Sequence, residues 1–134
     1  MHIFHDADLD WEPADPAHFT GTARAKRVGA ATDDPSVKIY RVAFEPGART
    51  DWHAHSGPQL LYVVEGRCRV QTWGEPAREA GPGDTVYIAP DEKHWHGAAP
   101  DAAAVHIAVN VDARTTWMER VTDAQYALVG GNGQ

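Results

Sequence analysis

The stretch Trp52-His53-Ala54-His55-Ser56-Gly57-Pro58-Gln59 carries the strongest signal for fold and function in this chain. Successive side chains of a β-strand alternate between faces, so His53 and His55 project from the same face. The Gly57-Pro58 pair predicts a turn, and Gln59 then opens an apolar run typical of a mostly buried strand. The stretch therefore predicts two imidazoles with a third donor, Gln59, close beside them.

A second pair of histidines, His94 and His96, follows about forty residues later, after a turn rich in Gly and Pro. A single His-x-His pair is more often structural than metal-binding. Two such pairs in one small domain favour a metal site, because neutral imidazole is the commonest protein ligand of transition metals.

Short apolar runs separated by Gly/Pro turns recur along the chain and predict an all-β fold, a jelly-roll type sandwich or barrel. The strongest predicted strands are Val37–Phe44, Gln59–Val64, Arg67–Trp73, Thr85–Ile88, His94–His96 and Ala103–Val111. Weaker signals predict a short strand within Phe19–Ala25, a polar loop over residues 30–35, a final strand at Trp117–Val121 and a helical turn at Asp123–Leu128.

The length of 134 residues predicts one domain that can bury about two thirds of its unfolded surface. We expect residues 1–17, rich in Asp and Pro, to form an extended N-terminal arm. Residues 18–128 would make the barrel and a C-terminal segment, and the Gly-rich residues 129–134 a flexible tail.

Composition excludes several classes of protein. The net charge is −7 and the basic residues are scattered, which argues against a nucleic-acid partner. Cys68 is the only cysteine, so no internal disulfide can form, and a reducing compartment fits best. With neither a signal-peptide pattern at the N-terminus nor an apolar run long enough to cross a membrane, we expect a cytoplasmic protein with no membrane partner.

Polar residues on one face of an otherwise apolar strand predict a lined cavity. In the Ala103–Val111 strand, His106, Ala108 and Asn110 share one face, while the valines and isoleucine share the other. Tyr40 and Val42 share a face in the first strong strand, and Thr50 lies close enough in sequence to the histidines to reach the same cavity. The alternative is that the polar stripe faces solvent.

The spacing of these residues resembles the first motif of the cupin family. Gly47, five residues, His53-x-His55, three residues, Gln59, six residues and Gly66 follow that motif, with Gln59 in place of the usual glutamate. Gly83, ten residues and His94 keep the length of the second motif, but Ala89, Asp91 and Ala98 replace its usual Pro, Gly and Asn. The resemblance implies a small β-barrel, usually a homodimer or higher homo-oligomer, with a metal held by His53, His55, Gln59 and His94.

Three further stretches are similar to the small manganese-dependent cupin hydroxynitrile lyases of bacteria. They are Phe44–Thr50, Glu92–Pro100 and Trp117–Asp123, and the similarity runs from about Phe19 to Tyr126. It implies cleavage and synthesis of cyanohydrins, with His106 as the general base and His96 beside it in the pocket. Tyr40 and Asn110 differ in size from the residues expected at these positions, which points to a different choice of substrate.

Three imidazoles and an amide leave the charge of a divalent ion uncompensated, which favours Lewis-acid chemistry on a small-molecule substrate over activation of dioxygen. The family resemblance implies Mn, while ligand type alone also allows Fe, Ni or Zn. Two alternatives remain at this stage: an iron-dependent dioxygenase of quercetinase type, which the missing carboxylate disfavours, and a non-catalytic cupin that binds a small metabolite.

Overall fold

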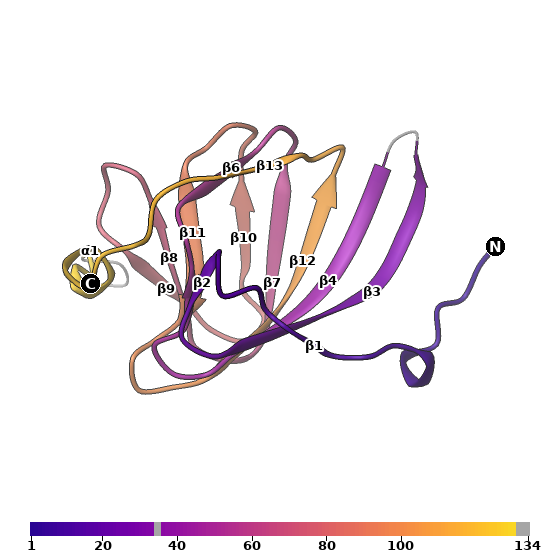
Figure 1. The fold of residues 1–134 in the computed structure, drawn as a ribbon, viewed down its shortest axis with the longest axis horizontal. Coiled ribbons are helices and arrows are strands. Elements are labelled where there is room, and N and C mark those ends of the chain that lie inside the picture. Colours follow the sequence, from indigo (N-terminus) through magenta and orange to yellow (C-terminus); the bar gives the residue numbers. More distant parts are fainter. Residues whose placement is uncertain (34–35, 131–134) are drawn as a thin grey trace.

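Two antiparallel β-sheets face each other in the computed structural model, which describes residues 1–33 and 36–130 (Figure 1). One sheet has six strands in the order β1-β3-β4-β12-β7-β10. The other has seven, with β13-β6-β11-β5-β2 in order and β8 joining β11 to β9. The strands are β1 (Glu12–Pro13), β2 (Phe19–Thr20), β3 (Ala23–Asp33), β4 (Ser36–Phe44), β5 (Arg49–Thr50), β6 (His53–His55), β7 (Gln59–Gly66), β8 (Cys68–Thr72), β9 (Arg78–Ala80), β10 (Thr85–Ile88), β11 (His94–Ala98), β12 (Ala104–Val111) and β13 (Thr115–Trp117).

This is the jelly-roll architecture that the sequence predicts, with the two sheets stacked rather than joined into one continuous barrel. Helical structure is limited to a 3-10 turn, η1 (Asp6–Asp8), in the arm and to α1 (Asp123–Ala127). The short α1 begins with a capping box in which the Thr122 hydroxyl accepts from the Gln125 backbone N–H. None of the described helices is long and apolar enough to cross a membrane.

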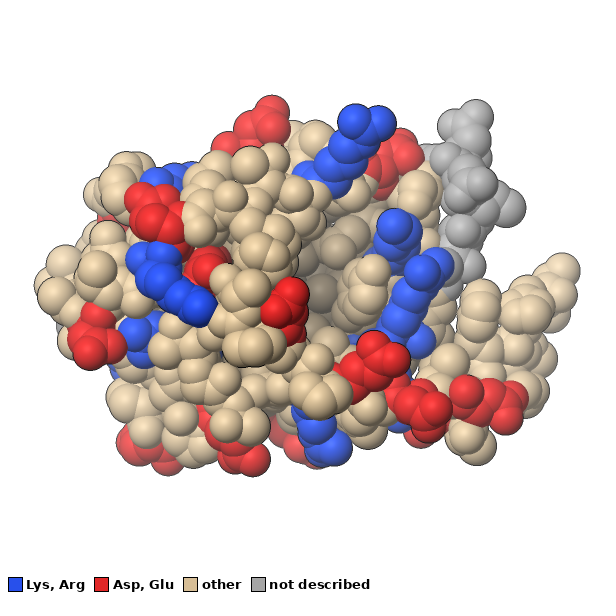
Figure 2. Space-filling model, viewed as in Figure 1, with Lys and Arg blue, Asp and Glu red and all other residues tan. Residues whose placement is uncertain are grey.

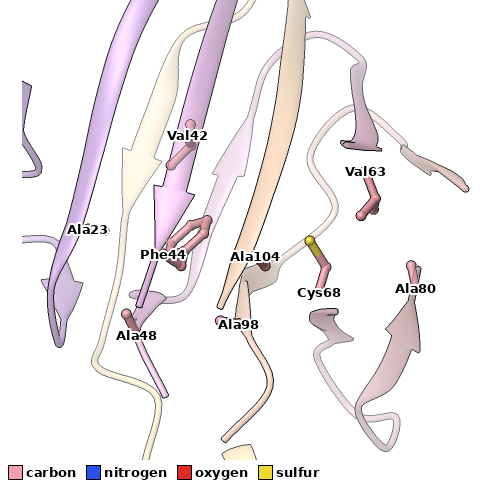
Figure 3. Close-up of a cluster of buried hydrophobic side chains, with 9 residues drawn as sticks. All are labelled: Ala23, Val42, Phe44, Ala48, Val63, Cys68, Ala80, Ala98 and Ala104. Carbon is pink, nitrogen blue, oxygen red and sulfur yellow. The ribbon is translucent and has the colours of Figure 1, made fainter. Parts of the chain in front are cut away.

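Figure 3 shows the main apolar core, which lies at the end of the sheets where β4 finishes and β12 begins. Phe44 and Val63 are its large members, and the rest are mostly small: Ala23, Val42, Ala48, Cys68, Ala80, Ala98 and Ala104. Small alanine side chains let the two sheets approach closely here. A separate cluster around Trp52, Trp95 and Tyr126 packs α1 onto the outside of the second sheet. Alternation along the chain turns Trp52 and Trp95 away from the neighbouring histidines, and both tryptophans are buried core residues.

Two glycines near the two ends of β7, Gly57 and Gly66, are required because the backbone of another segment lies too close to leave room for a Cβ. A Cβ on Gly57 would lie 2.0 Å from the carbonyl oxygen of Val111, and one on Gly66 would lie 1.8 Å from that of Ala103. Gly66 also has a positive φ of 74°. These two glycines therefore let the ends of β7 fit against the ends of β12.

Most predicted strands match the structure within one or two residues, but three segments differ. The single strand predicted within Phe19–Ala25 is divided, because Phe19–Thr20 pairs with β5 in the second sheet while β3 begins at Ala23 in the first. The predicted loop over residues 30–35 is shorter, because β3 continues to Asp33 in antiparallel pairing with β4, and residues 34–35 lie outside the described residues. The last strand is Thr115–Trp117 rather than Trp117–Val121, because Thr115 and Trp117 pair with His55 and His53. In the predicted tail, Val129 forms an isolated β-bridge with Ala77, in which the backbone N–H of Ala77 donates to Leu128 and that of Gly130 donates to Ala77. Residues 131–134 lie outside the described residues.

Candidate metal centre

Five polar donors from three strands meet at the end of the molecule opposite the alanine-rich core. His53 and His55 lie on β6, Gln59 begins β7, and His94 and His96 lie on β11, where His94 pairs directly with His53. Antiparallel pairing thus joins two histidines that are 41 positions apart in the sequence. All five side chains are buried.

Hydrogen bonds at Nδ1 orient two of these histidines, His53 and His94, so that an unprotonated Nε2 faces the cluster. Nδ1 of His53 lies 2.8 Å from the carbonyl oxygen of Asp51, and Nδ1 of His94 lies 2.8 Å from that of Glu92. Because a carbonyl oxygen only accepts, Nδ1 carries the hydrogen in both rings and Nε2 keeps its lone pair. Backbone partners of this kind orient imidazole ligands for metals.

The third ring, His55, is held in the same way by a side chain. Its Nδ1 lies 2.9 Å from Oγ1 of Thr115 on β13. Its Nε2 is buried, and within the described residues no hydrogen-bond partner reaches it. A buried polar atom without a partner lowers the stability of the fold by about 1–3 kcal/mol, and a ligand bound at Nε2 of His55 would remove this cost.

The amide of Gln59 is oriented by Asn110, its register partner on β12. Nε2 of Gln59 donates to Oδ1 of Asn110 at 2.8 Å, which turns Oε1 of Gln59 toward the histidines. That oxygen lies 3.3 Å from Nε2 of His94. With the hydrogen of His94 on Nδ1, these two atoms are both acceptors and repel each other, and a cation bound to both would remove the repulsion. The donors therefore fit a metal ion.

The distances between the donors indicate which of them could hold the same ion. The ligand atoms of His53, His94 and His96 all lie within 4.8 Å of one another. His55 is close to the same group, with its ring centroid 5.0 Å from that of His53 and 5.4 Å from that of His94. The structure thus groups His96 most tightly with the predicted ligands His53 and His94, and it places the other two predicted ligands, His55 and Gln59, beside them.

Burial keeps this cluster neutral. It lowers the pKa of His53 well below its ordinary value and also lowers the pKa of His94. The pKa of His55 is lowered to about 4. The positive charge of a protonated His94 would lower the pKa of both His53 and His55 further. Neutral rings at neutral pH are the form that binds metals.

His106 lies behind His96. Nε2 of His106 lies 3.0 Å from Nδ1 of His96, and His106 is fully buried between Phe44 and His96. Burial lowers the pKa of His106 to about 4 and that of His96 well below its ordinary value. The backbone N–H of His96 donates to Oγ1 of Thr50, which fixes the strand at this point.

A cavity of about 260 Å³ is lined by His53, His55, Gln59 and His96 of the donor cluster. The four residues expected from the sequence to line a pocket, Tyr40, Val42, Thr50 and Asn110, all line this cavity, as does His96, whereas His106 is not among its lining residues. Four further lining residues were not predicted: Phe19, Ala25, Thr115 and Trp117. Tyr40, Phe19 and Ala25 also border a wider groove of about 540 Å³ beneath the N-terminal arm. Tyr40 therefore stands at the boundary between the inner cavity and the groove.

The fold is a jelly roll, and a cluster of buried histidines lies on its strands β6 and β11. Residues 40–110 match the family model described as "Cupin domain", and the chain is a member of the cupin family.

Among individual proteins, the chain is 47% identical over 117 residues to the (R)-mandelonitrile lyase of Granulicella tundricola, covering 85% of this chain and 88% of that enzyme. A cupin-like protein of Thermotoga maritima is 39% identical, with a TM-score of 0.81 over 89% of this chain and 93% of that one. KdgF from Halomonas sp. is 26% identical, with a TM-score of 0.66 over 84% and 96%.

Proposed function

We propose that this cupin is a metal-dependent carbon–carbon lyase of hydroxynitrile lyase type, which cleaves a cyanohydrin to an aldehyde and hydrogen cyanide and catalyses the reverse addition. The similarity to an enzyme named (R)-mandelonitrile lyase over most of both chains supports the reaction class. The single observation that carries the proposal is the juxtaposition of a neutral donor cluster with the His96–His106 pair at one cavity.

His53, His55, Gln59 and His94 would hold the metal, with Mn as the first candidate and Fe, Ni or Zn as alternatives. When bound, the ion supplies Lewis-acid stabilisation to an oxygen of the substrate. All four donors are neutral, so none reduces the positive charge of a divalent ion, and this charge suits a developing alkoxide.

His96 and His106 would transfer the proton that the reaction moves. Cleavage breaks the O–H and C–C bonds, forms the C=O bond and sends the electron pair of the C–C bond to cyanide, so one proton must move from oxygen to cyanide. With Nδ1 of His96 bonded to His106, Nε2 of His96 is the nitrogen available to the cavity. His106, the base expected from the sequence, would accept the proton through His96, and the pair would return it to cyanide.

Apolar groups would hold the organic part of the substrate. Phe19, Val42, Ala108 and Trp117 line the cavity together with Tyr40. A cavity of about 260 Å³ has room for a small aromatic or aliphatic aldehyde, and its walls shield the reaction from water.

The direct test uses mandelonitrile as substrate. The proposal expects release of benzaldehyde in equal amount to cyanide, and, in the reverse direction, a cyanohydrin enriched in one enantiomer from benzaldehyde and cyanide. Racemic product at the uncatalysed rate would contradict it, and would leave binding of a small metabolite or dioxygenase chemistry as the function of this cavity.

A further inference from the structure

The strand β2 is a short edge element beside the inner cavity. Its two residues, Phe19 and Thr20, pair with Thr50 and Arg49 of β5 at the end of the second sheet. In Figure 1 this indigo strand lies in front of the six-stranded sheet, and in the same view Figure 2 shows the surface hollowed between β2 and the β3–β4 pair. So short a pairing is marginally stable by itself, so other contacts must help to hold β2 in place.

The cavity mouth is the place where the inner cavity meets the groove beneath the arm. Phe19, Ala25 and Tyr40 border both spaces and therefore surround this mouth. Ala25 and Tyr40 lie on β3 and β4, which pair along most of their length. Phe19 lies on the short β2. The Phe19 side of the mouth is therefore the side that backbone pairing holds least firmly.

One side chain from the C-terminal part of the chain, Arg120, bonds across this side of the mouth. Its Nη2 donates to the carbonyl oxygen of Pro16 at 2.6 Å, and its Nη1 donates to that of Phe19 at 2.7 Å. Nη1 also donates to Oδ1 of Asp51 at 3.1 Å. We call residues 16–20 the rim segment. The guanidinium of Arg120 thus joins the rim segment to the connection between β5 and β6.

Asp51 gives this contact a fixed base. Its side chain is 5% exposed, whereas that of Arg120 is 52% exposed. A buried carboxylate needs a partner, so Asp51 holds the guanidinium in one position instead of leaving it to move in solvent. The backbone of Asp51 also contacts both neighbours, because its N–H donates to the carbonyl oxygen of His18 in the rim segment and its carbonyl oxygen accepts from His53.

Aromatic rings connect the rim segment to the donor cluster. The ring of His18 stacks on that of Trp117, with centroids 4.3 Å apart and planes at 5°. Trp117 lines the cavity, and its ring centroid lies 4.8 Å from that of His53. The ring of Phe19 packs on the same tryptophan at 6.2 Å. A displacement of the rim segment would therefore uncover Trp117 and open the cavity next to the metal-binding residues.

We propose that Arg120 is a positioning residue that holds the rim segment closed over the cavity, and that release of its contacts opens the route by which a metal ion and a substrate reach the donor cluster. The closed segment excludes water from the cavity, and the open one admits small molecules. Like the proposed function, this proposal rests on metal binding at the cluster, but it does not rest on the lyase reaction.

The experiment measures how fast Mn(II) enters metal-stripped protein and how fast a chelator removes it, in wild-type protein and in Arg120→Ala. We expect both rates to rise about 10-fold and the affinity to stay within about 2-fold, because an open mouth eases passage in both directions while the ligands are unchanged. If Arg120 instead served to orient His53 through Asp51, its loss would speed release alone and weaken affinity, which would overturn the proposal. Arg114→Ala, at an exposed arginine beside β13, is the matched control and should keep wild-type rates.

The variant Arg120→Lys separates geometry from charge. A lysine ammonium keeps the positive charge near Asp51, but it lacks the planar fork that reaches the carbonyl oxygens of Pro16 and Phe19 together. Fast exchange of Mn(II) should therefore persist in this variant. Wild-type rates in Arg120→Lys would show that charge alone is sufficient and would contradict the proposed bridging of the rim segment.

Hydrogen exchange of metal-free protein tests the same contacts without a metal or a reaction. The backbone N–H of His18 donates to Asp15, and that of Asp51 donates to His18. Protection of these two amides should fall about 10-fold in Arg120→Ala and stay unchanged in Arg114→Ala, with circular dichroism showing that both variants fold. Unchanged protection in Arg120→Ala would overturn the proposal. A wild-type protein that binds no Mn(II) would count against the proposed function and would leave this exchange measurement to decide the role of Arg120.

Discussion

Nε2 of His106 and Nδ1 of His96 lie 3.0 Å apart in a fully buried contact, so one proton is shared between two rings of which only His96 lines the cavity. This relationship connects the cavity to a proton acceptor that water does not reach. Under the proposed function, His106 would accept a proton through His96 although it lies behind the cavity wall.

Replacing His106 by Ala should lower turnover of mandelonitrile about 100-fold to 10,000-fold, the usual contribution of a positioned acid or base. Metal content should not change, since His106 does not contact the proposed ligands other than through His96. Turnover and metal content are measured on the same sample. Loss of both together would mean that the residue is structural, and full activity would remove it from the mechanism.

Replacing Asn110 by Ala should weaken metal binding by about 10-fold to 100-fold, because the Gln59 amide would lose the acceptor that orients it. Affinity is measured by competition with a chelator. Val109→Ala is the control, since Val109 is the adjacent residue on β12 and faces away from the site. Equal effects of the two substitutions would show that the orientation of Gln59 does not matter.

Replacing Thr115 by Val removes the only side chain that reaches Nδ1 of His55 among the described residues. We expect a smaller loss of metal affinity than for Asn110→Ala, about 10-fold, with folding unchanged, because valine keeps the shape of threonine and β13 stays paired with β6. Unchanged affinity would argue against His55 as a ligand.

Replacing Tyr40 by Ala should open the inner cavity to the groove beneath the arm, because Tyr40 borders both. The kcat/KM ratio for a bulky aromatic cyanohydrin over a small aliphatic one should rise by about 10-fold. The ratio isolates the shape of the pocket from any general loss of activity. A ratio that stays constant would show that Tyr40 does not limit the size of the substrate.

Metal-free protein should become less stable as the pH falls from about 6.5 to about 4. His55 and His106 have folded-state pKa values of about 4, below the ordinary 6.5, so the unfolded chain binds more protons throughout this window. Stability is therefore fully present above pH 6.5 and is lost as the pH falls toward 4, by up to about 3 kcal/mol for each of the two residues. Urea unfolding at several pH values measures the slope, and a flat profile would contradict the assignment of neutral buried rings.

The strands and the grouping of His53, His55 and Gln59 follow from the sequence because they depend on local order, whereas His94 joins these residues through the pairing of β11 with β6. Alternation places His53 and His55 on one face, and the Gly-Pro turn sets the position of Gln59. Phe19, Thr115 and Trp117 could not be predicted in the same way, because they reach the cavity through pairings of β2 with β5 and of β13 with β6. Such pairings depend on tertiary contacts that a sequence window does not contain.

Alternation shows which residues share a face but not which face points inward. In β12 the more apolar face is the outer one, so hydrophobicity alone would have placed Val105, Ile107 and Val109 in the interior. The spacing of residues along a strand also does not show how deep a side chain lies between the sheets, so it could not predict that His106 lies behind His96.

Under the proposed function, catalysis requires both this chain and a bound divalent ion. Benzaldehyde release from mandelonitrile is measured with metal-stripped protein before and after Mn(II) is restored, at mildly acidic pH where the uncatalysed reaction is slow. Stripped protein should release benzaldehyde at the background rate and recover activity on addition of Mn(II), whereas the His106→Ala variant should recover about 100-fold less or lower still. Release that is the same with and without the ion, or none in either state, would rule out metal-dependent lyase chemistry.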